Sequence, residues 1–83
     1  MKVPRDLSGR QLAGLLAREF SYEVTRQRGS HIRITTQKNG VHHLTLPDHD
    51  PLRLGTLASI LNDVAQHFQI TRRDVEERLF SSR

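Results

Sequence analysis

The sequence predicts a two-layer α+β sandwich with the element order α-β-β-β-α(α). Apolar residues recur at helical spacing near both ends of the chain, and apolar and polar residues alternate between them. Glycine-containing turns separate the alternating segments. A sheet that is apolar on one face buries that face against helices, which gives two layers. With 83 residues, the chain has the length of a single domain, residues 1–83.

The helices are indicated by apolar spacing and by capping residues. Ser8 and Gln11 form a capping-box pattern, and the leucines that follow predict a helix over residues 9–19. A longer apolar pattern from Leu54 to Phe68 predicts the main helix. A last short helix should begin at Thr71, with Asp74 as its capping partner and Val75, Leu79 and Phe80 facing inward.

Three segments with period-two alternation predict antiparallel strands, over residues 21–27, 30–37 and 41–46. We expect the first two strands to be joined by a turn at Arg28-Gly29. Asn39-Gly40 should join the last two, because this pair strongly favours a tight hairpin.

Alternation also predicts which side chains share a face of the sheet. In the first strand, Tyr22 and Val24 should lie on one face. The residues expected under the helices are Ile32, Ile34, Leu44 and Leu46. The residues expected on the uncovered face are His31, Arg33, His43 and Thr45.

The positive charge is concentrated in the first half of the chain. The formal net charge is +4, with +5 in residues 1–40 and −1 in residues 41–83. Eleven of the thirteen basic residues are arginine, the side chain that binds phosphate through a planar fork. This distribution favours a nucleic-acid partner over an acidic protein or a membrane.

Several classes of protein are disfavoured by composition. The chain has no cysteine, so it forms neither disulfides nor a thiolate zinc site. The N-terminal segment lacks the apolar core of a signal peptide, and no apolar run reaches transmembrane length, so we expect a cytoplasmic protein without membrane contact. No cofactor is expected, because the thin core disfavours a deep pocket and no nucleotide-binding glycine motif occurs.

The candidate site is the segment "RQRGSHIRI", in which Gly29, Ser30 and His31 interrupt a basic, strand-like stretch. Glycine lets a phosphate approach the backbone, serine donates a hydrogen bond, and histidine exchanges protons near neutral pH. RNA carries its own nucleophile, the 2′-hydroxyl, so a histidine with oriented cations suffices for metal-free cleavage. The predicted RNA-binding residues are Arg26, Arg28, Gly29, Ser30, Arg33 and Lys38. The spacing alone favours a surface histidine that has no role.

A second cluster of potential ligands, His42 and His43 with Asp48, His49 and Asp50, raises the question of a metal site. Adjacent residues of a strand point to opposite faces, so the two neighbouring histidines do not easily share an ion. No helical pair of histidines with ligand spacing is present. We therefore predict no metal site and expect His42 to be a partly buried residue of the sheet.

Four segments resemble the HicA toxin family in their order: "SGRQLAGLLAREF", "GSHIRI", "LTLPDHD" and "LGTLASIL". The resemblance extends from about Val3 to Val75. It implies a fold like that of double-stranded-RNA-binding domains, which agrees with the element order above. It also implies an RNA-cleaving toxin, an mRNA interferase, that is held inactive by a HicB-like antitoxin.

The resemblance implies roles for particular residues. His31 matches the presumed catalytic histidine, Gly29 and Ser30 match its flanking elements, and no catalytic metal is implied. His49 matches a recurrent Pro-x-His whose role is structural or secondary. The chain departs from the family pattern in Ile32-Arg33, where many relatives have a second histidine or an aromatic residue. It departs again in the longer, glycine-free segment after the main helix, residues 65–74.

Three hypotheses follow. The chain is an RNA endonuclease toxin, a non-catalytic RNA-binding module, or a protein-interaction module that docks a partner on the open sheet face. The expected partners are messenger RNA and a HicB-like antitoxin. The expected assemblies are a homodimer through a sheet edge or a toxin–antitoxin complex.

Overall fold

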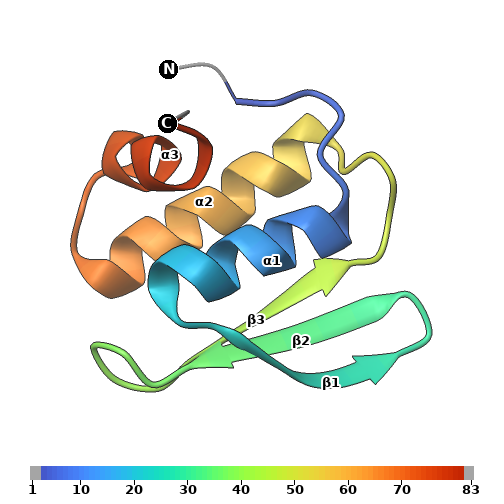
Figure 1. Ribbon diagram of the computed structural model, residues 1–83, viewed down its shortest axis with the longest axis horizontal. Coiled ribbons are helices and arrows are strands. Elements are labelled where there is room, and N and C mark those ends of the chain that lie inside the picture. Colours follow the sequence, from blue (N-terminus) through green and yellow to red (C-terminus); the bar gives the residue numbers. More distant parts are fainter. Residues whose placement is uncertain (1–2, 82–83) are drawn as a thin grey trace.

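The sheet and the helices form two layers in the computed structural model, which describes residues 3–81 (Figure 1). The elements are α1 (Gly9–Phe20), β1 (Glu23–Arg28), β2 (His31–Thr36), β3 (His42–Pro47), α2 (Leu54–Phe68) and α3 (Arg72–Phe80). The strands pair antiparallel in the order β1-β2-β3, and the three helices lie on one side of them. The predicted α+β class and element order are confirmed. The likeness to double-stranded-RNA-binding domains stays a prediction.

The helix boundaries follow from the caps. The Ser8 hydroxyl accepts a hydrogen bond from the Gln11 backbone amide at 3.1 Å, and the Gln11 side chain accepts one from the Ser8 amide at 2.9 Å. This reciprocal pair satisfies two amides at the start of α1 that have no partner within the helix. Thr71 and Asp74 form the same box ahead of α3, as predicted. α1 continues one residue beyond the predicted end, to Phe20.

The core lies between the sheet and the helices, where the predicted alternation of β2 and β3 is confirmed. Ile32, Ile34, Leu44 and Leu46 are buried. The helices contribute Leu12, Leu16 and Phe20 from α1, Leu57, Leu61 and Val64 from α2, and Val75 and Leu79 from α3. Phe80, also expected to face inward, is partly buried against this cluster. Because all the helices cover the same face, the opposite face of the sheet stays open.

β1 carries a β-bulge that simple alternation does not predict. Val24 pairs with Ile34, and Arg26 pairs with Arg33, so Thr25 is one extra residue on β1. Side chains of a strand alternate between faces, and an extra residue therefore reverses the alternation beyond it. Arg26 consequently faces away from the helices, on the same side as Arg33.

β1 is an edge strand and contributes nothing to the core. Tyr22, predicted to lie within this strand, precedes it and is only 1% exposed beneath the helices. Val24 also turns toward the helix side but lies at the edge of the sheet and is 59% exposed. All six residues of β1 are exposed.

The two hairpin turns differ in how well they match the prediction. Asn39 and Gly40 both have positive φ, 60° and 95°, as expected for a tight hairpin. The first turn lies one residue later than predicted, at Gly29–Ser30, because Arg28 is the last residue of β1. Gly29 adopts φ 57°, a left-handed conformation that disfavours residues with a Cβ.

The Gly29→Ala variant tests this turn. We expect the free energy of unfolding to fall by about 1 kcal/mol, because alanine is strained at this φ although no atom blocks its Cβ. Gly14→Ala is the matched control, since Gly14 lies exposed within α1 with open space around it and should gain up to about 1 kcal/mol. Urea unfolding followed by circular dichroism measures both. Equal stability of Gly29→Ala and the wild type would contradict the assigned turn.

Candidate nucleic-acid interface

The open face of the sheet arranges its side chains in three rows across the strands. The rows are Arg28–His31–Pro47, Arg26–Arg33–Thr45 and Glu23–Thr35–His43. Residues that pair directly point to the same side of a sheet. The prediction that His31 and Arg33 share the uncovered face is therefore confirmed.

A shallow hollow surrounds His31. Arg26, Arg28, His31, Arg33 and Thr45 line it, and its volume is about 240 Å³. Three of these five residues are arginines and none is acidic, so the hollow attracts anions. His31 is exposed, and within residues 3–81 its ring forms no hydrogen bond, which leaves both ring nitrogens available to a ligand. Thr45 was predicted to lie on the uncovered face but was not among the predicted site residues, and it enters the hollow as the partner of Arg33 on β3.

Lys38 does not join this hollow. It lies in the turn after β2, whereas His31 begins β2. The length of the strand separates the two by roughly 17 Å. Gly29 and Ser30, in contrast, form the turn immediately before His31.

The turn that precedes His31 is held by the segment after β3. The Asp48 amide donates to the Ser30 carbonyl at 2.7 Å. The Asp48 carboxylate accepts hydrogen bonds from Arg10 of α1 at 3.1 and 3.2 Å and from Gln27 of β1 at 3.4 Å. Asp48 thus ties α1, β1 and the Gly29–Ser30 turn together, a role that the sequence did not indicate.

α1 packs closely on the same segment. The Gly9 amide donates to the His49 carbonyl at 2.9 Å. A Cβ at Gly9 would collide with the Pro47 carbonyl oxygen, so only glycine fits at this position without a shift. His49 therefore contributes its backbone to the scaffold, while its ring lies outside the hollow around His31.

His42 belongs to a separate cluster on the helix side of the sheet. Its side chain is 18% exposed, which confirms the expected partial burial. Its Nδ1 lies 2.8 Å from the Tyr22 hydroxyl and its Nε2 lies 3.2 Å from Asp63 Oδ1. The His67 ring stacks on it with centroids 4.4 Å apart. Burial, with a smaller contribution from the negative charge of Asp63, raises the pKa of Tyr22 well above its ordinary value of 10.0.

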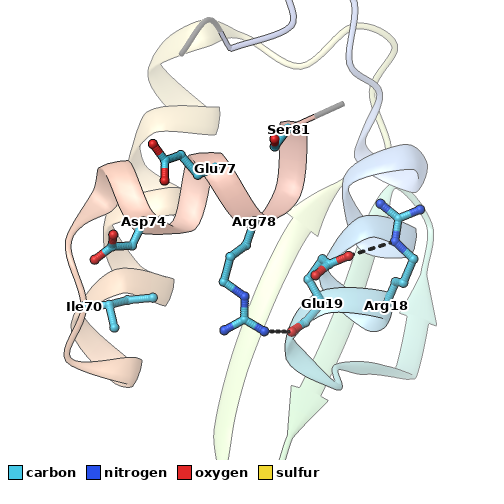
Figure 2. A pocket seen from close by; sticks show the side chains of 7 residues that line it. All are labelled: Arg18, Glu19, Ile70, Asp74, Glu77, Arg78 and Ser81. Atoms are coloured by element: carbon cyan, nitrogen blue, oxygen red, sulfur yellow. Dashed lines mark hydrogen bonds and ion pairs between the residues drawn. The ribbon is translucent and has the colours of Figure 1, made fainter. Parts of the chain in front are cut away.

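A larger hollow lies in the helical layer and has a different character. It measures about 860 Å³ and is lined by Arg18, Glu19, Ile70, Asp74, Glu77, Arg78 and Ser81 (Figure 2). Arg78 of α3 donates to the Glu19 carbonyl at 2.6 Å, and Arg18 pairs with the Glu19 carboxylate at 3.0 Å. Its charges are mixed and already paired in part, and it contains no histidine, so it offers no comparable chemistry.

Two further properties describe residues 3–81. No three side chains of histidine, cysteine, aspartate or glutamate gather there as a set of metal ligands. None of α1, α2 and α3 combines the length and the apolar composition that a membrane-spanning helix needs.

The architecture is that of a small α+β protein with one covered and one open, basic sheet face. A family model described as "HicA toxin of bacterial toxin-antitoxin" matches residues 9–65, more than half of the chain. The chain therefore belongs to the HicA toxin family. Comparisons with curated proteins and with solved structures found no match. The matched segment includes every residue of the hollow around His31, and membership assigns the chain a toxin role in a toxin–antitoxin pair.

The burial of Tyr22 in the cluster around His42 predicts that the protein loses stability at high pH. The folded-state pKa of Tyr22 exceeds the unfolded-state value. Tyr22 therefore makes its full contribution to the free energy of unfolding below pH 10, and this contribution is lost as the pH rises above 10. The chain contains one tyrosine and no tryptophan, so the absorbance of tyrosinate reports this group alone. We expect tyrosinate to appear only together with unfolding, and Tyr22→Phe to remove this part of the pH dependence. Tyrosinate formation near pH 10 in the folded protein would contradict the assignment.

Proposed function

We propose that the chain is an mRNA interferase, a metal-independent RNA endonuclease toxin with His31 as its catalytic residue. The observation that carries the proposal is the position of His31, exposed and without a hydrogen-bond partner among the described residues, in a hollow with three arginines. Arg26, Arg28 and Arg33 bind the phosphate that is attacked. Membership of the HicA toxin family supports the toxin role.

In the proposed reaction, the His31 imidazole takes the proton of a ribose 2′-hydroxyl, and the 2′-oxygen attacks the adjacent phosphorus. The bond from phosphorus to the 5′-oxygen breaks, and the imidazolium returns a proton to that oxygen. The products are a 2′,3′-cyclic phosphate and a 5′-hydroxyl end. The arginines stabilise the negative charge that develops on the phosphate oxygens.

Gly29 and Ser30 assist from the turn. No atom lies within 4 Å of the position that a Cβ would occupy at Gly29, so this side of the turn is open to the RNA backbone. Ser30 is exposed and supplies a hydroxyl donor for a phosphate oxygen. The reaction as proposed uses no metal ion and no cofactor.

We propose that the toxin acts on messenger RNA in the cytoplasm and is neutralised by a HicB-like antitoxin. A partner that covers the open sheet face excludes RNA from His31, so docking and inhibition coincide. The alternatives, a non-catalytic RNA-binding module or a protein-interaction module, predict no cleavage by the isolated chain. They are tested by the same experiment as the cleavage mechanism.

The His31→Ala variant tests the catalytic role. With an unstructured RNA in EDTA, we expect the wild type to cleave and the variant to be slower by at least roughly 10²-fold, because no imidazole moves the proton. His49→Ala is the control, since that exposed ring lies outside the hollow, and it should cleave like the wild type. Cleavage that survives in His31→Ala, or that requires added divalent metal, would refute the mechanism.

The arginines are tested by the salt dependence of binding. In the His31→Ala background, we expect Arg28→Ala to reduce the slope of log affinity against log salt by about 1, because one phosphate contact is lost. Arg73, an exposed residue of α3, is the matched control, and its substitution by alanine should leave the slope unchanged. Identical slopes for the Arg28→Ala and Arg73→Ala proteins would place RNA binding elsewhere.

A further inference from the structure

A second, polar hollow lies on the open face, at the end of the sheet remote from His31. Its volume is about 260 Å³, and it is lined by Ser21, Glu23, Thr25, Thr35, Gln37 and Lys38. It differs from the first hollow in charge, because its lining contains one carboxylate, one ammonium group and otherwise neutral hydrogen-bonding groups. Lys38, which does not reach the hollow around His31, lines this one.

A chain of hydrogen bonds orders the boundary of this second hollow. The Thr25 hydroxyl lies 3.4 Å from the Arg33 carbonyl, which only accepts, so Thr25 donates to it. Thr25 Oγ1 also lies 2.9 Å from Thr35 Oγ1, which in turn lies 2.8 Å from His43 Nδ1. The His43 ring of β3 ends this chain, with its Nδ1 bound to Thr35.

Glu23 supplies a hydrogen-bond acceptor that lines the second hollow. It pairs across the sheet with Thr35, which in turn pairs with His43. Within residues 3–81, Glu23 forms no ion pair, so its carboxylate oxygens stay available to a ligand. A carboxylate that faces this hollow matches a base that presents an amino group, since carboxylates accept hydrogen bonds from exocyclic amines of bases. Lys38 at the rim suits a phosphate of the same nucleotide.

The distance to His31 separates this site from the chemistry. Thr35 lies four residues along β2 from His31, which corresponds to roughly 13 Å. His43, beside Thr35, is therefore too far away to act on the phosphate that His31 contacts. Arg33 lies between the two hollows and belongs to the first. One RNA strand that follows the open face thus meets both hollows with different nucleotides.

We propose that the second hollow binds the base of a nucleotide that flanks the cleaved bond, and that Glu23 makes it prefer adenine, cytosine or guanine over uracil. The position of this nucleotide beside the cleaved bond rests on the proposed function, whereas the base preference is a property of binding alone. Single-stranded RNA is the fitting ligand, because its unstacked bases expose their hydrogen-bonding edges. His43 does not line this hollow; it positions Thr35 and takes no part in the chemical step.

The test uses the His31→Ala protein, so that RNA stays intact, with fluorescently labelled oligo-A, oligo-C and oligo-U. By fluorescence anisotropy, we expect oligo-A and oligo-C to bind at least about tenfold more tightly than oligo-U, as one added charge-assisted hydrogen bond implies. A Glu23→Gln substitution should reduce this ratio to less than about twofold. Glu77→Gln, an exposed change on α3, should leave the ratio unaltered.

Equal affinities for the three oligonucleotides, the same ratio with and without Glu23→Gln, or no binding at all would overturn the inference. The wild type is assayed for cleavage in parallel. A base preference that depends on Glu23, in a protein that does not cleave RNA, would refute the proposed function and leave this binding site standing. Cleavage without any contribution of Glu23 to base preference would refute this binding site and leave the proposed function standing.

Discussion

The composition of the open sheet face depends on one extra residue in β1. Thr25 is that residue, and without the bulge the alternation that places Val24 toward the helices would place Arg26 and Arg28 there as well. The bulge instead turns both arginines to the side of His31. The Thr25 hydroxyl, bonded to Thr35 and to the Arg33 carbonyl, fixes the bulged residue on the open face. The same residue thus gives the first hollow its charge and orders the boundary of the second.

Most of the fold was predictable because its signals are local. The capping boxes at Ser8 and Thr71 and the helical spacing of the leucines involve residues within one or two turns. The alternation in β2 and β3 is equally local, and it correctly predicted that Ile32 and Leu44 are buried. The placement of His31 on the open face followed from the same alternation, and the family resemblance that singled it out is confirmed at the level of the family.

The features that were missed depend on contacts between distant segments. A bulge is set by how two strands pair, so the sequence of β1 alone did not reveal it. The first turn also lies one residue later than predicted. Lys38 was predicted to bind RNA, and that role stays a prediction, but its distance of a whole strand from His31 became apparent only in the fold. The link from Asp48 to Arg10 spans 38 positions of the chain. At this separation, the residue types alone do not predict that the two side chains form an ion pair.

The central claim is that His31 on the open face takes the proton of RNA's own 2′-hydroxyl. The most direct measurement uses an RNA with one mapped cleavage position and a copy in which the nucleotide 5′ of that bond is 2′-deoxy. We expect cleavage at that bond to disappear in the deoxy copy, while the unmodified RNA yields a 2′,3′-cyclic phosphate. Continued cleavage at the deoxy position would contradict the account, because the nucleophile would then come from water or from the protein.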